Sequence, residues 1–158
     1  MKNVEFNQRA IALLGGYLLQ FLAGMFLNLF VTIPSKHPGS SGDNYLGRSF
    51  HSLVWSLSGS GGWVLSFHAG LALLLVLGSL SLFVMALIAH SRLWSVSGGI
   101  AALLTLGAFF NGLSFIDFNK NISSMIMAIC WVGAVSVLVL GLLKHTKSGT
   151  KTSQHVFS

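Results

Sequence analysis

Four long apolar stretches with almost no charge divide this chain. They cover residues 11–33, 63–89, 96–116 and 122–143. Each is close to the ~20 residues that an α-helix needs to cross a hydrocarbon core of ~30 Å. Because backbone N–H and C=O groups find no water inside lipid, such stretches must be helical there. The pattern therefore predicts an all-α fold, a polytopic membrane four-helix bundle.

The connections between these spans differ in length. Residues 89–95 and 117–121 are short enough to make the spans on either side antiparallel neighbours. The first loop, residues 34–62, begins with a cluster of turn-forming residues and continues with a helical stripe of apolar ones. The stripe consists of Leu46, Phe50, Leu53, Val54 and Leu57. We expect a short interfacial helix in this outer loop, lying along the membrane surface.

The chain divides into one four-span domain, residues 1–143, and a basic tail, residues 144–158. We expect the tail to be disordered and to lie beside the lipid head groups. Lys2 and Arg9 precede the first span, as basic residues do in a signal peptide. The apolar stretch that follows exceeds the ~7–15 residues of a signal sequence, so we expect it to be a retained span.

Charge supports a membrane location and predicts an orientation. The formal net charge is +6, although only 8% of the residues are charged and 53% are hydrophobic. The basic residues lie in tails and loops, which favours a lipid bilayer rather than nucleic acid as partner. The side of the termini carries Lys2, Arg9, Arg92, Lys144, Lys147 and Lys151, and the other side carries Lys36, Arg48 and Lys120. This bias predicts a multi-pass protein of the cell membrane with both termini cytoplasmic.

Rows of small and polar residues mark one face in two of the spans. The first span has Gly16, Gln20, Gly24, Asn28 and Thr32, and the third has Gly98, Ala101, Thr105, Ala108, Asn111 and Gly112. Small residues let membrane helices approach closely, and amides supply hydrogen bonds between them. We expect both faces to turn inward. The helix-packing residues would then be Gly16, Gln20, Gly24, Thr105, Ala108 and Gly112.

Polar residues also gather at one depth near the outer ends of the spans. Asn28, His68 and Asn111 each lie about five residues, or roughly 8 Å, from an outer helix end. An ionisable residue inside a span is costly and is therefore a candidate functional group. We predict a ligand-binding pocket formed by Asn28, His68 and Asn111, with His51 and Trp55 as its lid. A quinone, haem or lipid head group would fit, whereas a competing interpretation has His68 only fixing helix packing.

Histidines raise the question of a cofactor. Haem with two histidine ligands needs imidazoles at matched depth, and His90 lies about 33 Å from His68 along the same helix. Only His51 could pair with His68, by folding down over the bundle. A divalent metal would use His37, His51 and His68 with a carboxylate, Asp43 or Asp117. No short metal motif is present, and His37 lies in a Pro-Gly turn typical of surface histidines.

Catalytic motifs are missing from the sequence. It contains no Cys-x-x-Cys, HExxH, P-loop or nucleophile elbow, and its single Cys130 has no disulfide partner. The carboxylates are Glu5, Asp43 and Asp117 alone. The sequence thus favours a protein that is not an enzyme. A structural or partner-binding membrane subunit and a small oligomeric transporter or channel are the alternatives to a ligand-binding or redox-accessory protein.

Several short segments resemble those of a group of small, uncharacterised four-helix bacterial membrane proteins. They are Gly24-Met-Phe-Leu-Asn-Leu-Phe-Val-Thr-Ile-Pro34, His37-Pro-Gly, His68-Ala-Gly, Phe110-Asn-Gly and Ser123-Ser-Met-Ile-Met-Ala128. The resemblance covers most of residues 10–143. It implies a bacterial chain that is complete in one domain, and it implies no activity, cofactor or functional residue.

Overall fold

The protein is all-helical in the part that the structure, a computed structural model, describes. This part comprises residues 2–40 and 44–154, with side chains described for residues 4–40 and 44–144. The helices are α1 (Lys2–Phe30), α2 (Tyr45–Leu57), α3 (Trp63–Ile88), α4 (Arg92–Phe118) and α5 (Asn121–Gln154). All but α2 contain a segment long and apolar enough to cross a membrane: Val4–Phe30, Trp63–Ile88, Arg92–Phe118 and Asn121–Lys144. The predicted all-α fold with four membrane-span helices is confirmed.

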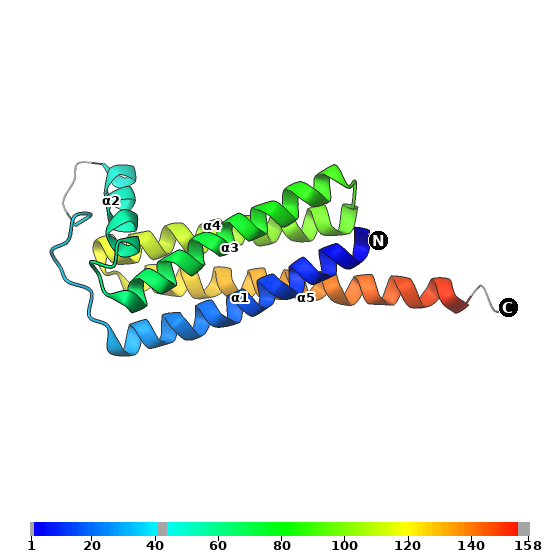
Figure 1. The fold of residues 1–158 in the computed structure, drawn as a ribbon, viewed down its shortest axis with the longest axis horizontal. Helices are drawn as coiled ribbons and strands as arrows, with labels where there is room; N and C mark the ends of the chain where they lie inside the picture. The colour runs from blue at the N-terminus through cyan, green and yellow to red at the C-terminus, as the bar shows by residue number, and fades with distance from the viewer. Residues whose placement is uncertain (1, 41–43, 155–158) are drawn as a thin grey trace.

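The four long helices run alongside one another, with both ends of the chain at the same end of the bundle (Figure 1). Helix α3 packs against α4, and α4 against α5, as the short connections predict. Helix α1 packs mainly on α3 and makes fewer contacts with α5. The short helix α2 lies across the end opposite the termini, where it contacts α3 and α4. One end of the bundle is therefore covered and the other carries the termini.

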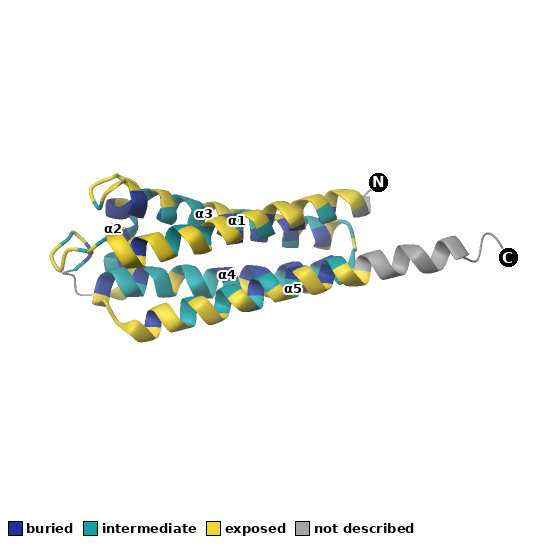
Figure 2. Ribbon diagram, turned by 90° about the horizontal axis from the view of Figure 1, so that it is seen from below, coloured by how far each residue is buried: buried dark blue, intermediate teal, exposed yellow. Residues whose placement is uncertain are grey.

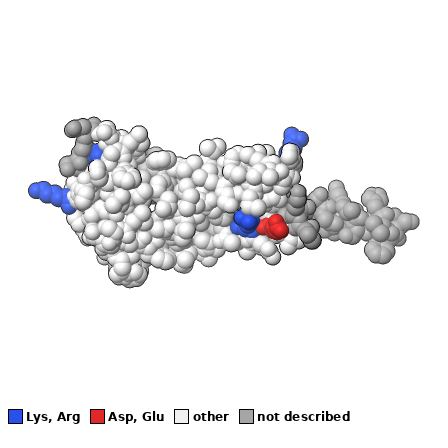
Figure 3. Space-filling view, turned by 45° about the horizontal axis from the view of Figure 1, so that its top comes forward, with Lys and Arg blue, Asp and Glu red and all other residues white. Residues whose placement is uncertain are grey.

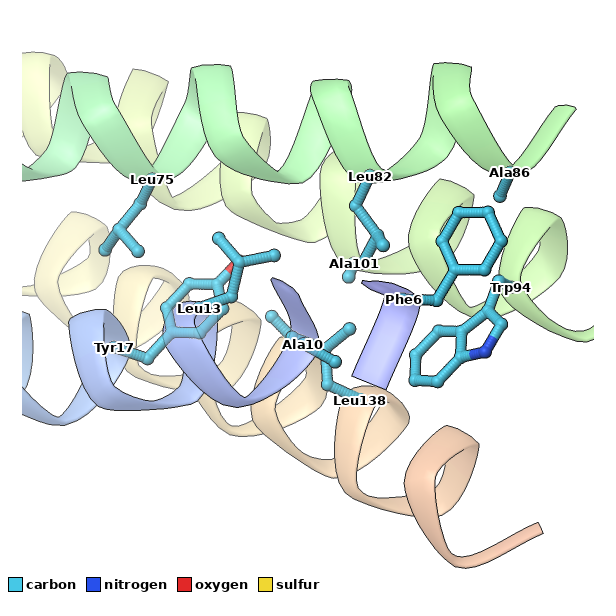
Figure 4. Packing of buried hydrophobic residues seen from close by; sticks show 11 residues of the cluster. Phe6, Ala10, Leu13, Tyr17, Leu75, Leu82, Ala86, Trp94, Ala101 and Leu138 are labelled. Atoms are coloured by element: carbon cyan, nitrogen blue, oxygen red, sulfur yellow. The ribbon is translucent and has the colours of Figure 1, made fainter. Parts of the chain in front are cut away.

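The largest core cluster occupies the half of the bundle near the termini and draws on all four long helices (Figure 4). Trp94, Leu82 and Leu138 are fully buried there, and Phe6 stacks on Trp94 with ring centroids 6.3 Å apart. Buried residues face the inside of the bundle, whereas the outward faces are exposed and apolar (Figure 2). On the face shown in Figure 3, charged residues lie toward the two ends. This distribution suits a molecule whose middle lies in lipid.

The two tight turns end α3 and α4 with residues in the left-handed conformation. His90 follows α3 with a φ of 54°, and Asn119 follows α4 with a φ of 48°. The Ser91 N–H donates to the Ala86 carbonyl at 3.0 Å, which is the Schellman arrangement that closes a helix. The turns are shorter than predicted, because the helices extend into residues 92–95 and 117–118.

Helix α1 begins near the start of the chain, at Lys2, rather than at residue 11, and it ends at Phe30 rather than at residue 33. Hydropathy marks where a helix enters lipid, and the polar residues before that point continue the same helix. Helix α5 likewise runs to Gln154, through a segment for which disorder was predicted, although the apolar span ends at Lys144. Residues 155–158 lie outside the described residues.

Helix α2 forms where the apolar stripe predicted it. Asn44 caps its first turn, with the Asn44 side-chain oxygen accepting from the Gly47 N–H at 2.6 Å. The stripe itself is turned away from the bundle: Leu46, Phe50, Val54 and Leu57 are exposed. The opposite face, with Ser49, Ser52 and Ser56, is buried. The helix thus packs on the bundle through serines and presents its apolar side to the surroundings.

Candidate functional site

His68 lies between α1 and α3, enclosed by two residues of α1 that the sequence assigned to helix packing. Its Nε2 is 3.1 Å from the Nε2 of Gln20. Gly24, one turn further along α1, packs close to the same ring, where an added Cβ would be 3.1 Å from the imidazole Cε1. His68 is five residues from the start of α3, or about 8 Å. The pair therefore lies within the apolar span.

The contact between His68 and Gln20 does not satisfy all the polar atoms of the two side chains. His68 Nδ1 and Gln20 Oε1 are both buried, and neither has a hydrogen-bond partner. Turning the Gln20 amide by 180° exchanges its oxygen and nitrogen, but one amide atom and Nδ1 still remain unpaired. Burying a polar group without a partner costs roughly 1–3 kcal/mol. A pair that leaves two such atoms in an apolar span is consequently a candidate binding site.

The structure does not bring the five predicted pocket residues together. Asn28 is exposed on α1, and His51 is exposed on α2, where it contacts the edge of Phe50. Asn111 donates from Nδ2 to the Gly107 carbonyl of its own helix at 2.8 Å. Within the described residues, no hydrogen bond or ring contact joins His68 to any of the other four. Gln20 provides the amide that was expected from Asn28 or Asn111.

Trp55, expected in the lid, is buried against His37 instead. The two rings stack with centroids 4.8 Å apart and planes 20° from parallel. His37 Nδ1 accepts from the Gly39 N–H at 3.3 Å, so its Nε2 carries the proton and donates to the Ile116 carbonyl at 3.1 Å. The expectation that His37 is an ordinary surface histidine is wrong: it anchors the first loop to the end of α4.

A hydrogen-bonded cluster holds α2 on the bundle, and we call it the cap. Its centre is the buried Asp117 carboxylate of α4, which accepts from the hydroxyls of Ser49 and Ser52. The Arg48 guanidinium donates to the carbonyls of Gly39, Ser40 and Asp117 at 3.1–3.2 Å. The cap consists of Gly39, Ser40, Arg48, Ser49, Ser52 and Asp117. Each of its polar side chains has a protein partner.

The cap was not predicted from the sequence, although a signal for it exists. Ser49, Ser52 and Ser56 recur at intervals of three and four residues on the face of the helix opposite the apolar stripe. Serines at such spacing predict a helix that docks through hydrogen bonds. Tyr45 adds a further link from the first turn of α2, with its hydroxyl 2.7 Å from the Ser114 Oγ of α4.

The remaining predicted packing residues face different partners from one another. A Cβ on Gly16 would lie 2.9 Å from Leu75 of α3, and one on Gly112 would lie 3.2 Å from Met127 of α5. Thr105 is buried and bonds to the Tyr17 hydroxyl of α1. Ala108 is half-buried. The row on α1 thus faces α3, while the row on α4 is shared among α1, α3 and α5.

The histidines considered for a metal or haem are separated by their positions in the fold. Among the described residues, no group of three or more His, Cys, Asp and Glu is placed to hold a metal ion. His37 is engaged with Ile116, His51 is exposed, and His68 lies between the helices. Asp43, one of the two carboxylates considered, lies outside the described residues, and the other, Asp117, belongs to the cap.

Comparison with protein-family models, with curated proteins and with solved structures yields no match. The assignment of a function to this chain therefore depends on the chemistry of its own residues.

Proposed function

We propose that this integral membrane protein binds a small ligand at the His68–Gln20 pair, in a ligand-binding or redox-accessory role. The observation that supports the proposal is the pair of buried, unpartnered atoms, His68 Nδ1 and Gln20 Oε1. A ligand that supplies the missing hydrogen bonds recovers the free energy that the unliganded pair loses. Gln20 thereby replaces Asn28 and Asn111 as the amide that orients the bound group.

The chemistry of the pair favours a quinone over the other ligands considered. With the Gln20 amide nitrogen donating to His68 Nε2, His68 Nδ1 carries a proton and donates, whereas Gln20 Oε1 accepts. A quinone carbonyl accepts from Nδ1, and the hydroxyl of the corresponding quinol can donate to Oε1. The neighbouring residues of both helices are apolar, which suits the ring and tail of a quinone. An imidazole can also receive a proton that is released when the quinol is oxidised. Haem fits less well, because the Gln20 amide already contacts His68 Nε2 and Gly24 packs close to the neighbouring Cε1.

The first test separates haem from colourless ligands. The protein, purified in detergent, is examined by absorption spectroscopy before and after reduction with dithionite. We expect no Soret band. A Soret band that shifts on reduction would contradict the quinone proposal and make His68 a haem ligand.

The second test measures quinone binding directly. Decylubiquinone is titrated into the detergent-solubilised protein, and binding is followed by quenching of tryptophan fluorescence. We expect His68→Ala and Gln20→Ala each to weaken binding about tenfold, the equivalent of one lost hydrogen bond of ~1.4 kcal/mol. Asn28→Ala is the matched control, because Asn28 is an exposed amide on the same helix. Equal affinities for all four proteins would refute the site.

A structural role for the pair is the second candidate function. It is favoured by Gly24, whose lack of a side chain lets α1 approach the His68 ring closely. In this case the protein is a subunit that binds a membrane partner, and His68 only joins α1 to α3. His68→Ala would then lower the unfolding temperature of the protein in detergent. The quinone proposal instead expects loss of binding in a variant that remains folded.

We also propose that the protein resides in the cell membrane with both termini in the cytoplasm. The excess of Lys and Arg on the side of the termini supports this orientation. A green fluorescent protein fused to the C-terminus should fluoresce, and an alkaline phosphatase fused there should be inactive. The reverse pattern would show that the orientation is opposite.

A further inference from the structure

A groove of about 310 Å³ lies between α1 and α3, on the side of the His68–Gln20 pair that is nearer the termini. Its walls include Leu13 and Gly16 from α1 and Leu71, Leu75 and Gly78 from α3. At two glycines in the lining, leucine side chains of the facing helix pack against the backbone. A Cβ on Gly16 would be 2.9 Å from Leu75, and one on Gly78 would be 3.0 Å from Leu13. Its volume is near the lower end of small-molecule sites, ~300 Å³.

Arg9 is the only charged residue that the structure describes in the lining of the groove, and it lies at the end near the termini. Arg9 lines the groove and donates from Nη1 to the Ser81 hydroxyl of α3 at 3.4 Å, a long and weak hydrogen bond. The side chain is exposed. Glu5 lies one turn away on α1, yet no carboxylate among the described residues forms an ion pair with Arg9. The guanidinium therefore retains most of its capacity to donate.

Arg9 lies close enough to the edge of the hydrocarbon core for its side chain to reach the lipid phosphates. Ser81 is seven residues from the last residue of α3, and α3 itself is 26 residues long, about 39 Å. A hydrocarbon core of ~30 Å leaves roughly 5 Å of this helix outside lipid on each side. Ser81 then lies only about 6 Å inside the boundary. A flexible arginine side chain at this depth reaches the phosphate level by extending toward water.

We propose that the groove binds one anionic phospholipid, with its phosphate on Arg9 and one acyl chain between α1 and α3. Charge complementarity selects the occupant: the groove combines an unpaired guanidinium with apolar walls, and an anionic phospholipid combines a phosphate with an apolar chain. Planar guanidinium groups bind phosphate oxygens through two parallel hydrogen bonds. The lining of the groove ends about one helical turn from His68 and Gln20, and neither residue is part of it, so the lipid site is separate from the proposed ligand site.

Native mass spectrometry of the full chain in detergent tests the proposal. The probes are dioleoyl phosphatidylglycerol and dioleoyl phosphatidylcholine, which share acyl chains and differ in net charge. We expect the wild-type protein to retain one phosphatidylglycerol in preference to phosphatidylcholine. We expect Arg9→Gln to weaken phosphatidylglycerol binding about fivefold, the effect of one basic residue near a lipid surface, ~1 kcal/mol. Glu5→Gln should strengthen it.

Matched variants distinguish the groove from general attraction to charge. Arg92→Gln removes an exposed cation at the same end, outside the groove, and should change binding by less than about twofold. Gly78→Leu fills the groove and should abolish the preference for phosphatidylglycerol over phosphatidylcholine. Gly15→Leu adds the same bulk where nothing lies within 4 Å, so the preference should remain. Equal losses in Arg9→Gln and Arg92→Gln would overturn the proposal, as would unchanged binding in Gly78→Leu.

Two further arms identify the ligand and separate this site from that of His68. Inorganic phosphate at millimolar concentration should not displace the lipid, because it lacks the acyl chain. Displacement would show that Arg9 binds phosphate without help from the groove, and would overturn the proposal. His68→Ala should leave phosphatidylglycerol binding unchanged, so failure of the quinone proposal and failure of the lipid proposal give different results.

Discussion

The cap and the interface between α1 and α3 both place polar side chains between helices, and they differ in how those side chains are satisfied. In the cap, the Asp117 carboxylate accepts two serine hydroxyls and Arg48 donates to three carbonyls. Between α1 and α3, the single contact of His68 with Gln20 leaves Nδ1 and Oε1 unpaired. A satisfied cluster stabilises one arrangement of the helices, whereas an unsatisfied one favours a ligand.

The packing, like the hydrogen bonding, is more constrained at the cap than between α1 and α3. At the cap, Gly39 lies so close to α2 that an added Cβ would be 2.8 Å from the Arg48 carbonyl and would overlap the Ser52 hydroxyl. Next to Gly16 of α1 and Gly78 of α3, the nearest atoms are the ends of leucine side chains, which can rotate. The cap therefore contributes most to holding the helices in one arrangement, whereas side chains between α1 and α3 can adjust.

The largest expected effect comes from Gly39→Ala compared with Gly16→Ala. The methyl group at residue 39 meets backbone, so we expect a loss of about 1–3 kcal/mol in the free energy of unfolding. At residue 16 the methyl meets only Leu75 Cδ2, and alanine gains about 0.5–1 kcal/mol in helix propensity. Unfolding in detergent, followed by circular dichroism, measures both. If both variants lose the same free energy of unfolding, the cap is not more tightly packed than the interface between α1 and α3.

Asp117→Ala should destabilise the protein about as much as Gly39→Ala, but it has no stabilising counterpart between α1 and α3. The change leaves the buried hydroxyls of Ser49 and Ser52 without their acceptor, so we expect a loss of about 1–3 kcal/mol. Asp117→Asn keeps one acceptor oxygen and should lose less. The unfolding temperature of the three proteins in the same detergent gives the order. If alanine and asparagine are equally stable, the carboxylate does not hold α2 in place.

At the α1–α3 interface, removing both polar groups should have little effect on stability. We expect the double variant Gln20→Leu, His68→Leu to unfold within about 1 kcal/mol of wild type, since no satisfied hydrogen-bond network is lost. The same double variant should no longer bind decylubiquinone. A loss of stability as large as that of Asp117→Ala would show that the pair is structural, as the second candidate function requires.

The smallest effect on stability is expected on the exposed side of α2. Phe50→Ser removes an exposed side chain and should change the free energy of unfolding by less than about 0.5 kcal/mol. The location of this side chain can nevertheless be measured. In a Cys130→Ser background, a fluorophore on Phe50→Cys should be quenched by brominated lipids, and one on Ser60→Cys should not. Quenching at neither position would exclude an interfacial α2.

The sequence predicts the helices well and their ends less well. Apolar length reveals the four spans, because lipid requires it. The start of α1 at Lys2 and the extension of α5 to Gln154 cannot be found in this way, since a helix can continue into water without any apolar signal. Helix α2 was predicted from its apolar stripe, but its contact face depends on serines, which hydropathy does not distinguish from loop residues.

The site residues were predicted in part, and the geometry of a helix explains the rest. His68 was identified from its cost inside a span, yet its partner was expected to be Asn28 or Asn111. A row with a spacing of four residues advances about 40° around the helix at every step, because one turn takes 3.6 residues. Gln20 and Gly24 consequently reach His68, while Asn28 has rotated to the exposed side and Thr32 lies beyond the end of the helix. Counting depth alone could not reveal this rotation.

The order in which the chain is synthesised gives the cap a consequence for biogenesis. Ser49 and Ser52 precede their acceptor, Asp117, by 68 and 65 residues. When α2 leaves the ribosome, the residue that holds it has not yet been made, and two further spans must enter the membrane first. The first loop therefore stays unlocked during most of insertion. The cap can form only after the end of α4 has reached the side of the membrane where α2 lies. A formed cap therefore indicates that the third span has crossed the membrane.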